Sequence, residues 1–184
     1  MGKLIVWNLM SLEGYFEGPA MWDLNFRGSV WSEDLEALSA EHTTTSVALV
    51  FGRVTYEGME AYWTSGAENG PLADAMNSLP KYVASTTLKS TTWNNSHILA
   101  APLGESIARL KREHDGNLFV FGSAKLIHAL RPLDLIDEYR IGIAPLFLGA
   151  GTPLFKPDAP PRELKLIEAR TLKRDCVLMR YARA

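Results

Sequence analysis

Two short segments combine glycine with hydroxyl and basic side chains, a set of groups that suits phosphate binding. Their members are Gly52, Arg53, Val54 and Thr55 in the first segment, and Gly122, Ser123, Ala124 and Lys125 in the second. Each segment follows an apolar run and precedes a helical pattern, where unpaired backbone N–H groups and the helix dipole attract anions. Glycine permits close approach, the hydroxyls donate hydrogen bonds, and the Arg53 guanidinium is a planar fork suited to phosphate. We predict a phosphate site at both junctions; the alternative is that the glycines are turn residues and Ser123 a helix cap.

A third candidate is the Ser-Thr-Thr sequence at residues 85–87, which follows another apolar run. The hydroxyls of Ser85 and Thr86 suit a ribose phosphate, although such residues also form turns. The familiar nucleotide fingerprints G-x-G-x-x-G and G-x-x-x-x-G-K-[ST] are absent, as are the H-E-x-x-H zinc motif and the G-x-S-x-G nucleophile motif. The four histidines lack ligand spacing, so no metal site is predicted.

The elements that must position these groups alternate between strand and helix patterns. Predicted strands cover residues 4–10, 47–51, 82–85, 97–100 and 118–121, and helices are expected after residues 32, 52, 102 and 123. Further strands at residues 138–148, 164–169 and 176–181 follow one another without a helix. The pattern predicts an α/β fold, a three-layer α/β/α arrangement whose mostly parallel sheet ends in an antiparallel hairpin. The aromatic-rich connection 11–30 is expected to be a lid or binding loop.

Composition narrows the possible functions. The 184 residues suit one domain, and the 47% hydrophobic and 22% charged contents are those of a globular protein. A formal net charge of −2 disfavours nucleic acid as a partner. The one cysteine excludes an intramolecular disulfide, and neither a signal peptide nor a membrane span is found. We expect a single domain over residues 1–184 in the cytoplasm.

Several stretches together resemble the dihydrofolate reductase-like superfamily, and within it the branch of the riboflavin-biosynthesis reductase domain (the RibD C-terminal domain). They are residues 9–14 (LMSLEG), 51–59 (FGRVTYEGM), 81–85 (KYVAS), 121–123 (FGS) and 145–155 (PLFLGAGTPLF). The resemblance spans about residues 3–181, and its most specific parts are the G-R-x-T-Y-E junction and the L-G-x-G-x-x-L-F segment. It departs from many relatives at Glu13, where they have Asp.

The resemblance implies an NADPH-dependent reductase. By that similarity, residues 52–55 hold coenzyme phosphates, and Arg53 favours the 2′-phosphate of NADP. Ser85 and Thr86 line the adenosine ribose, and residues 122–125 hold the pyrophosphate. The loop 11–30 corresponds to a lid near the nicotinamide. A homodimer is also implied, since relatives in this branch often pair.

Three acids near the start of the second predicted helix compete for the role of proton donor. On a helical wheel, Asp34 flanks the stripe of Trp31, Leu35, Leu38 and His42, whereas Glu33 and Glu36 point away from it. Asp34 is therefore the candidate catalytic acid; the alternative is that it stabilises the helix N-terminus. Four aromatic side chains could form a stacking surface for the substrate: Trp7, Trp22, Phe26 and Trp31.

The function expected from these observations is hydride transfer from NADPH to a C=N or C=O group of a small heteroaromatic compound, such as a pterin or aminopyrimidine. Two alternatives remain open. One is a non-catalytic NADP-binding protein that acts as a sensor or assembly module, and the other is a true dihydrofolate reductase.

Overall fold

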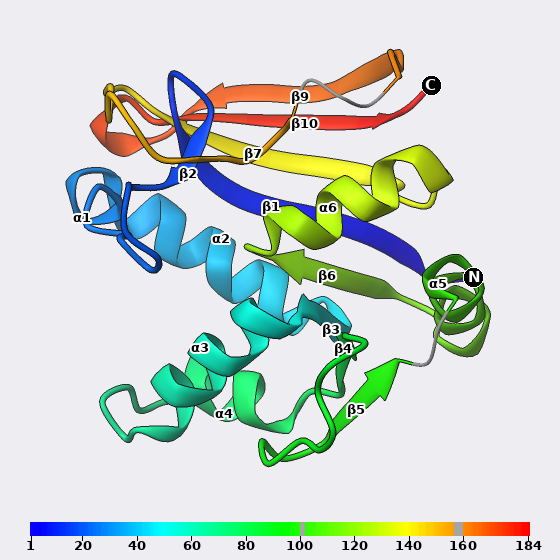
Figure 1. Ribbon diagram of the computed structural model, residues 1–184. Coiled ribbons are helices and arrows are strands. Elements are labelled where there is room, and N and C mark those ends of the chain that lie inside the picture. Colours follow the sequence, from blue (N-terminus) through cyan, green and yellow to red (C-terminus); the bar gives the residue numbers. More distant parts are fainter. Residues whose placement is uncertain (100–101, 157–159) are drawn as a thin grey trace.

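An eight-stranded sheet forms the centre of the computed structural model, which describes residues 1–99, 102–156 and 160–184 (Figure 1). In chain order its strands are β1 (Lys3–Ser11), β3 (Ser46–Gly52), β4 (Lys81–Ala84), β5 (Ser96–Leu99), β6 (Asn117–Phe121), β7 (Glu138–Ala144), β9 (Leu164–Thr171) and β10 (Val177–Arg183). Their order across the sheet is β5-β4-β3-β6-β1-β7-β10-β9. The pairs from β5 to β7 are parallel, and β10 is antiparallel to both β7 and β9. The predicted fold class is confirmed.

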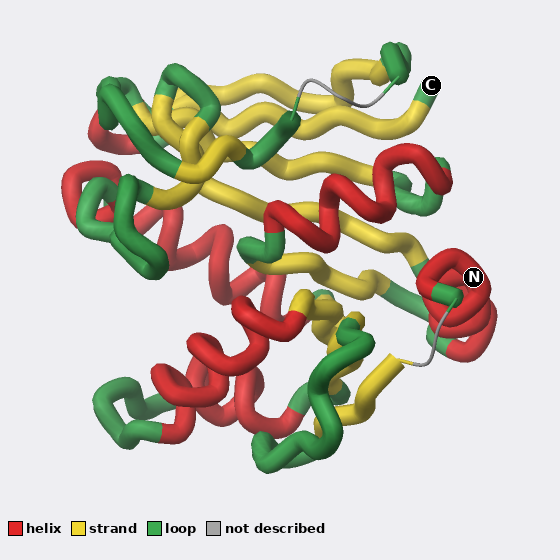
Figure 2. Tube along the Cα trace, in the orientation of Figure 1, coloured by secondary structure: helices red, strands yellow, loops and turns green. Residues whose placement is uncertain are grey.

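Helices cover both faces of the sheet and complete the three layers (Figure 2). One face packs against α2 (Glu33–Thr44), α3 (Arg53–Thr64) and α4 (Pro71–Ser78), and the other against α5 (Leu103–Glu113) and α6 (Ala124–Leu130). Strand β1 is buried on both sides: its odd-numbered apolar residues join the first core and its even-numbered ones the second. None of the described helices is long and apolar enough to cross a membrane.

The segment 11–30 contains more structure than the single loop that the sequence predicts. It holds a short strand, β2 (Tyr15–Glu17), and one helical turn, α1 (Arg27–Val30), and β2 pairs with β8 (Thr152–Pro153). Two 3₁₀ turns, η1 (Arg131–Leu133) and η2 (Lys173–Asp175), complete the elements. Helix α4 was not predicted from the sequence. Ala100, at the end of the predicted strand 97–100, lies outside the described residues.

Strand order determines which junctions meet. Because β3 and β6 are parallel neighbours, their carboxyl ends lie at the same edge of the sheet, and the helices α3 and α6 both begin there. Strand β4 lies beside β3 and ends at the same edge, while β1 lies on the far side of β6. Ligands of open α/β sheets bind beyond the carboxyl ends of the strands. The topology therefore collects all three predicted phosphate-binding segments at one edge.

Candidate functional site

A cavity of about 690 Å³ opens at this edge of the sheet. All ten residues predicted to bind the coenzyme line it: Gly52, Arg53, Val54, Thr55, Ser85, Thr86, Gly122, Ser123, Ala124 and Lys125. The remaining wall includes residues of the segment 16–27, Met59 of α3, Thr152 of β8, and residues at the ends of β4 and β5 and in α5 and α6. Three segments that are far apart in the sequence thus form one concave surface.

Two hydrogen bonds join the junctions after β3 and β6. The backbone N–H of Gly52 donates to Ser123 Oγ at 3.1 Å, and the backbone N–H of Ser123 donates to Thr55 Oγ1, also at 3.1 Å. Each hydroxyl oxygen accepts a bond and keeps its own proton, which remains free to donate. Helix α3 has no side-chain cap, so the first-turn amides of residues 53–55 also lack helical partners. The combination supplies hydroxyl and amide donors side by side.

The backbone at Gly122 is in the left-handed region, with φ of +60°, which glycine adopts readily. An added Cβ would lie 3.2 Å from Thr55 Cγ2. The carbonyl of Gly122 accepts a hydrogen bond from Asn8 Nδ2 at 3.2 Å, and Asn8 is buried within β1. Asn8 therefore helps to fix this corner. Sequence analysis missed it, because the adjacency of β1 and β6 is not visible in the sequence.

The cationic side chains lie at the mouth of the cavity. Arg53 is exposed and donates to both carboxylate oxygens of Glu57 at 3.0 Å, one helical turn further along α3. Lys125 is also exposed. Ser85 Oγ accepts hydrogen bonds from the N–H groups of Thr87 and Leu88, so Ser85 forms a turn, one of the two possibilities seen in the sequence, and lines the cavity as well.

Residues 16–27 form a cover that packs onto α3. The Trp22 ring lies so close to Gly58 that a Cβ added there would be 1.9 Å from Trp22 Cζ2. Glu17 holds the cover from within, because one carboxylate oxygen accepts from the Trp22 N–H at 2.8 Å and the other from Thr152 Oγ1 at 2.9 Å. This arrangement packs the Trp22 ring against the middle of α3 and gives the cavity an apolar wall on the side of the cover. Glu17 and Thr152 carry no recognisable motif and were missed.

A family model of the RibD C-terminal domain matches residues 2–178. The chain belongs to this family. The resemblance drawn from the sequence motifs is thereby confirmed, and the fold also agrees with it.

Relatives of this RibD C-terminal domain include the Bacillus subtilis (strain 168) protein YyaP, which is 31% identical over 106 residues, 58% of this chain and 56% of YyaP. The match therefore spans just over half of that relative. A solved structure from Shewanella sp. PV-4, whose name links it to riboflavin biosynthesis, has a TM-score of 0.80 at 23% identity, with 99% of each chain covered. The Enterococcus faecalis dihydrofolate reductase, solved with NADP(H), has a TM-score of 0.61 at 15% identity, covering 98% of this chain and 96% of that one. At these identities the two structures establish the shared fold.

Two motifs of the RibD C-terminal domain touch each other through Glu13. Its carboxylate accepts hydrogen bonds from the N–H groups of Leu148 at 2.6 Å and Gly149 at 3.2 Å. The S-L-E-G segment after β1 thus anchors the L-G-x-G segment after β7. The Glu13 carboxylate therefore has a structural role, which is to fix the loop at residues 148–149.

Of the four aromatic residues predicted to bind the substrate, Trp22 alone lines the cavity. Trp7 and Phe26 are buried in the core beneath α2 and α1, and the Trp7 ring packs edge-on against His42 at 4.9 Å. Trp31 is 44% exposed and precedes α2, so its assignment to the buried stripe of that helix was wrong. Bulky aromatic residues occupy cores more often than sites, and the sequence alone does not separate the two cases.

Asp34 lies on α2, outside the lining of the cavity. Its Oδ2 accepts a hydrogen bond from the backbone N–H of Lys173 at 2.7 Å, and the Lys173 ammonium pairs with Glu33. Both acids therefore tie the start of α2 to η2, the turn between β9 and β10. The structure does not bring Asp34 together with the phosphate-binding segments; Glu17 is the carboxylate that lines the cavity within the described chain.

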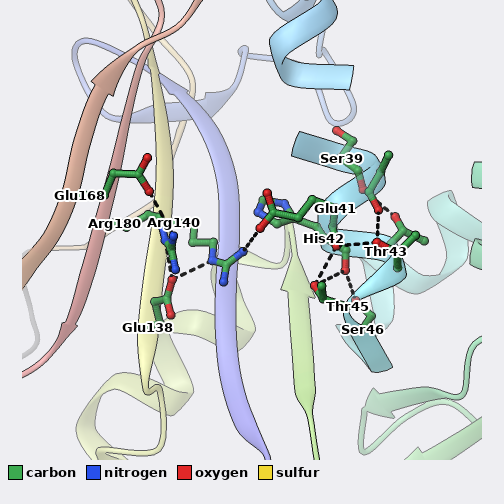
Figure 3. A network of polar contacts seen from close by, with 12 residues as sticks. Ser39, Glu41, His42, Thr43, Thr45, Ser46, Glu138, Arg140, Glu168 and Arg180 are labelled. Atoms are coloured by element: carbon green, nitrogen blue, oxygen red, sulfur yellow. Dashed lines mark hydrogen bonds and ion pairs between the residues drawn. The ribbon is translucent and has the colours of Figure 1, made fainter. Parts of the chain in front are cut away.

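A second polar cluster lies away from the cavity, between α2 and the strands β7 and β10 (Figure 3). Glu138 accepts from Arg140 Nε at 2.7 Å and from Arg180 Nε at 2.8 Å, and Arg140 also faces Glu41. Burial alone would raise the pKa of Glu138, but these bonds outweigh burial and lower it. Burial, reinforced by the two arginines, lowers the pKa of the neighbouring His42 to about 3. The cluster is a paired interior network that joins α2 to the sheet.

Proposed function

We propose that this RibD C-terminal domain is an NADPH-dependent reductase that acts on a C=N or C=O group of a small heteroaromatic substrate, such as a pterin or aminopyrimidine. The observation that carries the proposal is the joining of the two glycine corners through Ser123 and Thr55 at one cavity wall. The donors there match the oxygen acceptors of a pyrophosphate. NADPH, when bound, supplies the hydride.

The protein's own residues bind and orient the coenzyme and exclude water. The hydroxyl protons of Thr55 and Ser123 and the first amides of α3 orient phosphate oxygens, and the left-handed Gly122 leaves room for them. Arg53 turns from Glu57 to the 2′-phosphate; an exposed pair of this kind is worth only about 0–1 kcal/mol, so a phosphate can displace it. The cover closed by Trp22 keeps water from the transfer.

The test has two stages. NADPH binding is measured first by calorimetry, and its oxidation is then followed at 340 nm with a panel of pterins, aminopyrimidines and quinones, and with dihydrofolate. Binding with turnover of one class supports the proposal. Binding without turnover of any compound favours the non-catalytic NADP-binding alternative, and turnover confined to dihydrofolate favours a true dihydrofolate reductase. Absence of binding refutes all three.

We further propose a cytoplasmic location, where NADPH is supplied and the single buried thiol of Cys176 stays reduced. A homodimer is proposed as the working assembly.

A further inference from the structure

Lys81, the first residue of β4, places an ammonium group in the interior of the fold. Its side chain is completely buried and donates hydrogen bonds to three backbone carbonyls, those of Asn77 at 3.0 Å, Leu79 at 2.8 Å and Asn94 at 3.0 Å. The ammonium nitrogen also lies 4.4 Å from the centroid of the Trp93 ring. Within the part of the chain that the structure describes, Lys81 forms no ion pair with a carboxylate. Fully buried lysines are rare and are normally paired, so this set of partners is unusual.

The three carbonyls belong to two separate parts of the chain. Asn77 and Leu79 lie at the C-terminal end of α4, where the last carbonyls lack helical partners and the helix dipole favours a cation. Asn94 lies in the connection between β4 and β5. Burial lowers the pKa of Lys81 to about 8, so at neutral pH the group keeps the three protons that these carbonyls accept. Lys81 therefore fastens the chain before β5 to the end of α4.

Trp93 extends this contact to the first turn of α3. Its backbone N–H donates to Tyr56 Oη at 3.1 Å, and its indole Nε1 donates to Asn77 Oδ1 at 2.7 Å. Trp93 and Tyr56 are both buried, so these bonds are shielded from water. Tyr56 follows Thr55, which lines the cavity. The interior contacts of Lys81 thus reach the junction after β3.

The other end of the connection between β4 and β5 forms part of the cavity wall. Ala84 at the end of β4 pairs with Gly52 at the end of β3, so the chain leaves both strands at the same level. Residues 85–87 follow Ala84 and line the cavity, as Gly52 and the first residues of α3 do. The connection therefore begins at the cavity and returns to the interior, where Lys81 holds it.

We propose that Lys81 is a positioning residue of the candidate coenzyme site. Its ammonium group holds the connection between β4 and β5 against α4 and α3, and this fixes the hydroxyls of residues 85–87 relative to the amides at the start of α3. The proposal rests on the proposed reductase function for the identity of the ligand, whose adenosine half is expected at Ser85 and Thr86. A lysine that only stabilised the fold would not affect one half of the coenzyme more than the other.

The test divides the coenzyme into 2′,5′-ADP, its adenosine half, and nicotinamide mononucleotide, its other half. Calorimetry measures both for the wild type, Lys81→Ala and Leu110→Ala, a control that truncates a buried side chain of α5 outside the cavity lining. The measurements on Lys81→Ala are repeated with propylammonium chloride, which replaces the missing part of the side chain, and with sodium chloride at the same concentration. Circular dichroism checks folding, and hydrogen exchange reports on residues 85–95.

We expect Lys81→Ala to weaken 2′,5′-ADP about ten-fold and to leave nicotinamide mononucleotide within about two-fold of the wild type, because the displaced hydroxyls serve the adenosine half. Exchange in residues 85–95 should become faster. Propylammonium should restore both the affinity and the protection, whereas sodium chloride should restore neither. Leu110→Ala should bind both halves like the wild type.

Unchanged 2′,5′-ADP affinity in folded Lys81→Ala overturns the proposal, as does an equal loss for both halves or the same loss in Leu110→Ala. If the wild type binds neither half, the proposed coenzyme is wrong, and hydrogen exchange then decides on Lys81 separately. Protection that is lost in Lys81→Ala and restored by propylammonium supports its anchoring of residues 85–95, and unaltered protection contradicts it.

Tyr56→Phe replaces Lys81→Ala if the latter does not fold, because it removes the hydroxyl that accepts the Trp93 N–H and leaves Lys81 in place. A loss of affinity confined to 2′,5′-ADP, with faster exchange in residues 85–95, then supports the proposal. Unaltered binding and exchange in Tyr56→Phe overturn it.

Discussion

Hydroxyl groups at the candidate site perform two tasks at once. Thr55 Oγ1 and Ser123 Oγ accept backbone N–H groups from the opposite junction and keep their own protons for a ligand. The same atoms thereby fix the spacing of the two corners and provide donors. A single glycine junction with free amides would lack this cross-link. The two junctions together are therefore stronger evidence for a phosphate site than either junction alone.

Arg53 should decide between the two pyridine dinucleotides. We expect Arg53→Ala to weaken NADPH binding about 10- to 100-fold and to leave NADH nearly unchanged, because only NADPH carries the 2′-phosphate that the guanidinium can hold. Calorimetric titration with both coenzymes measures the ratio. Glu57→Gln is the matched control: it releases Arg53 from its exposed pair and should tighten NADPH slightly. Equal losses for both coenzymes would remove Arg53 from this role.

Variants of Asp34 test whether this residue is a catalytic proton donor or a structural residue. Its bond to the Lys173 N–H predicts that Asp34→Asn, which keeps an acceptor oxygen, leaves both turnover and stability close to wild type. Asp34→Ala should cost about 1 kcal/mol of unfolding free energy through the lost bond, measured by urea denaturation. A folded Asp34→Asn protein without turnover would instead restore Asp34 as the proton donor expected from the sequence.

At the scale of elements, the closed cover depends on one glycine of α3. Gly58→Ala should displace Trp22, because the new Cβ would overlap its ring, while the helix itself gains up to about 1 kcal/mol from the higher propensity of alanine. The expected result is faster hydrogen exchange in residues 18–26 and weaker NADPH binding, with an unchanged or higher Tm. Trp22→Ala should open the same segment without touching α3. Unaltered exchange in Gly58→Ala would show that the cover is held by other contacts.

Some elements of this fold can be predicted from the sequence and others cannot. The long apolar runs predicted the strands β1, β3 and β6 correctly, because burial on both faces leaves a signal in every residue. Short elements such as α4 and β2 have too few residues for a period to emerge. The ten residues predicted to bind the coenzyme line one cavity, whereas the contacts of Asn8 and Glu17 depend on strand order and on the path of the cover. Such long-range neighbours leave no local pattern.

For the whole molecule, the buried His42 makes stability depend on pH. Its pKa is lowered to about 3 in the folded protein against about 6.5 when unfolded, so the unfolded state binds the proton first as pH falls. The neutral His42 therefore contributes its full stabilisation above about pH 6.5. Acidification from pH 7 to pH 5 should lower the free energy of unfolding by about 2 kcal/mol. Urea unfolding at both pH values measures it.

His42→Leu is the matching variant, since neither ring nitrogen of His42 has a hydrogen-bond partner in the described chain. Leucine should keep the contact with Trp7 and Phe119 and remove most of the pH dependence. The interior pair Arg140–Glu138 stays in place, so a slope that persists in His42→Leu would point to the carboxylates of that cluster rather than to the imidazole.

We place the interface of the proposed homodimer at the C-terminal strands of the sheet. There β9 forms an edge, and no described helix lies in front of β9 and β10 (Figure 1). Leu164, Leu166 and Ile167 of β9 are 43%, 52% and 48% exposed, and a neighbouring cavity of about 580 Å³ has a largely apolar lining. The first half of this edge strand exposes three apolar side chains close together, and such a patch on an unpaired edge can pair with another copy.

We therefore expect light scattering after gel filtration to give twice the chain mass of 20.4 kDa for the wild type and a monomer for Leu166→Lys, because a charge at the centre of the edge opposes burial. Tyr62→Lys is the control, since Tyr62 is 46% exposed on α3, which packs near the other end of the sheet, and should leave the dimer intact. The cavity proposed to bind NADPH lies at the carboxyl ends of β3 and β6, distant in strand order from β9, so the Leu166→Lys monomer should still bind NADPH. A wild-type protein that elutes as a monomer at all concentrations would contradict this assembly.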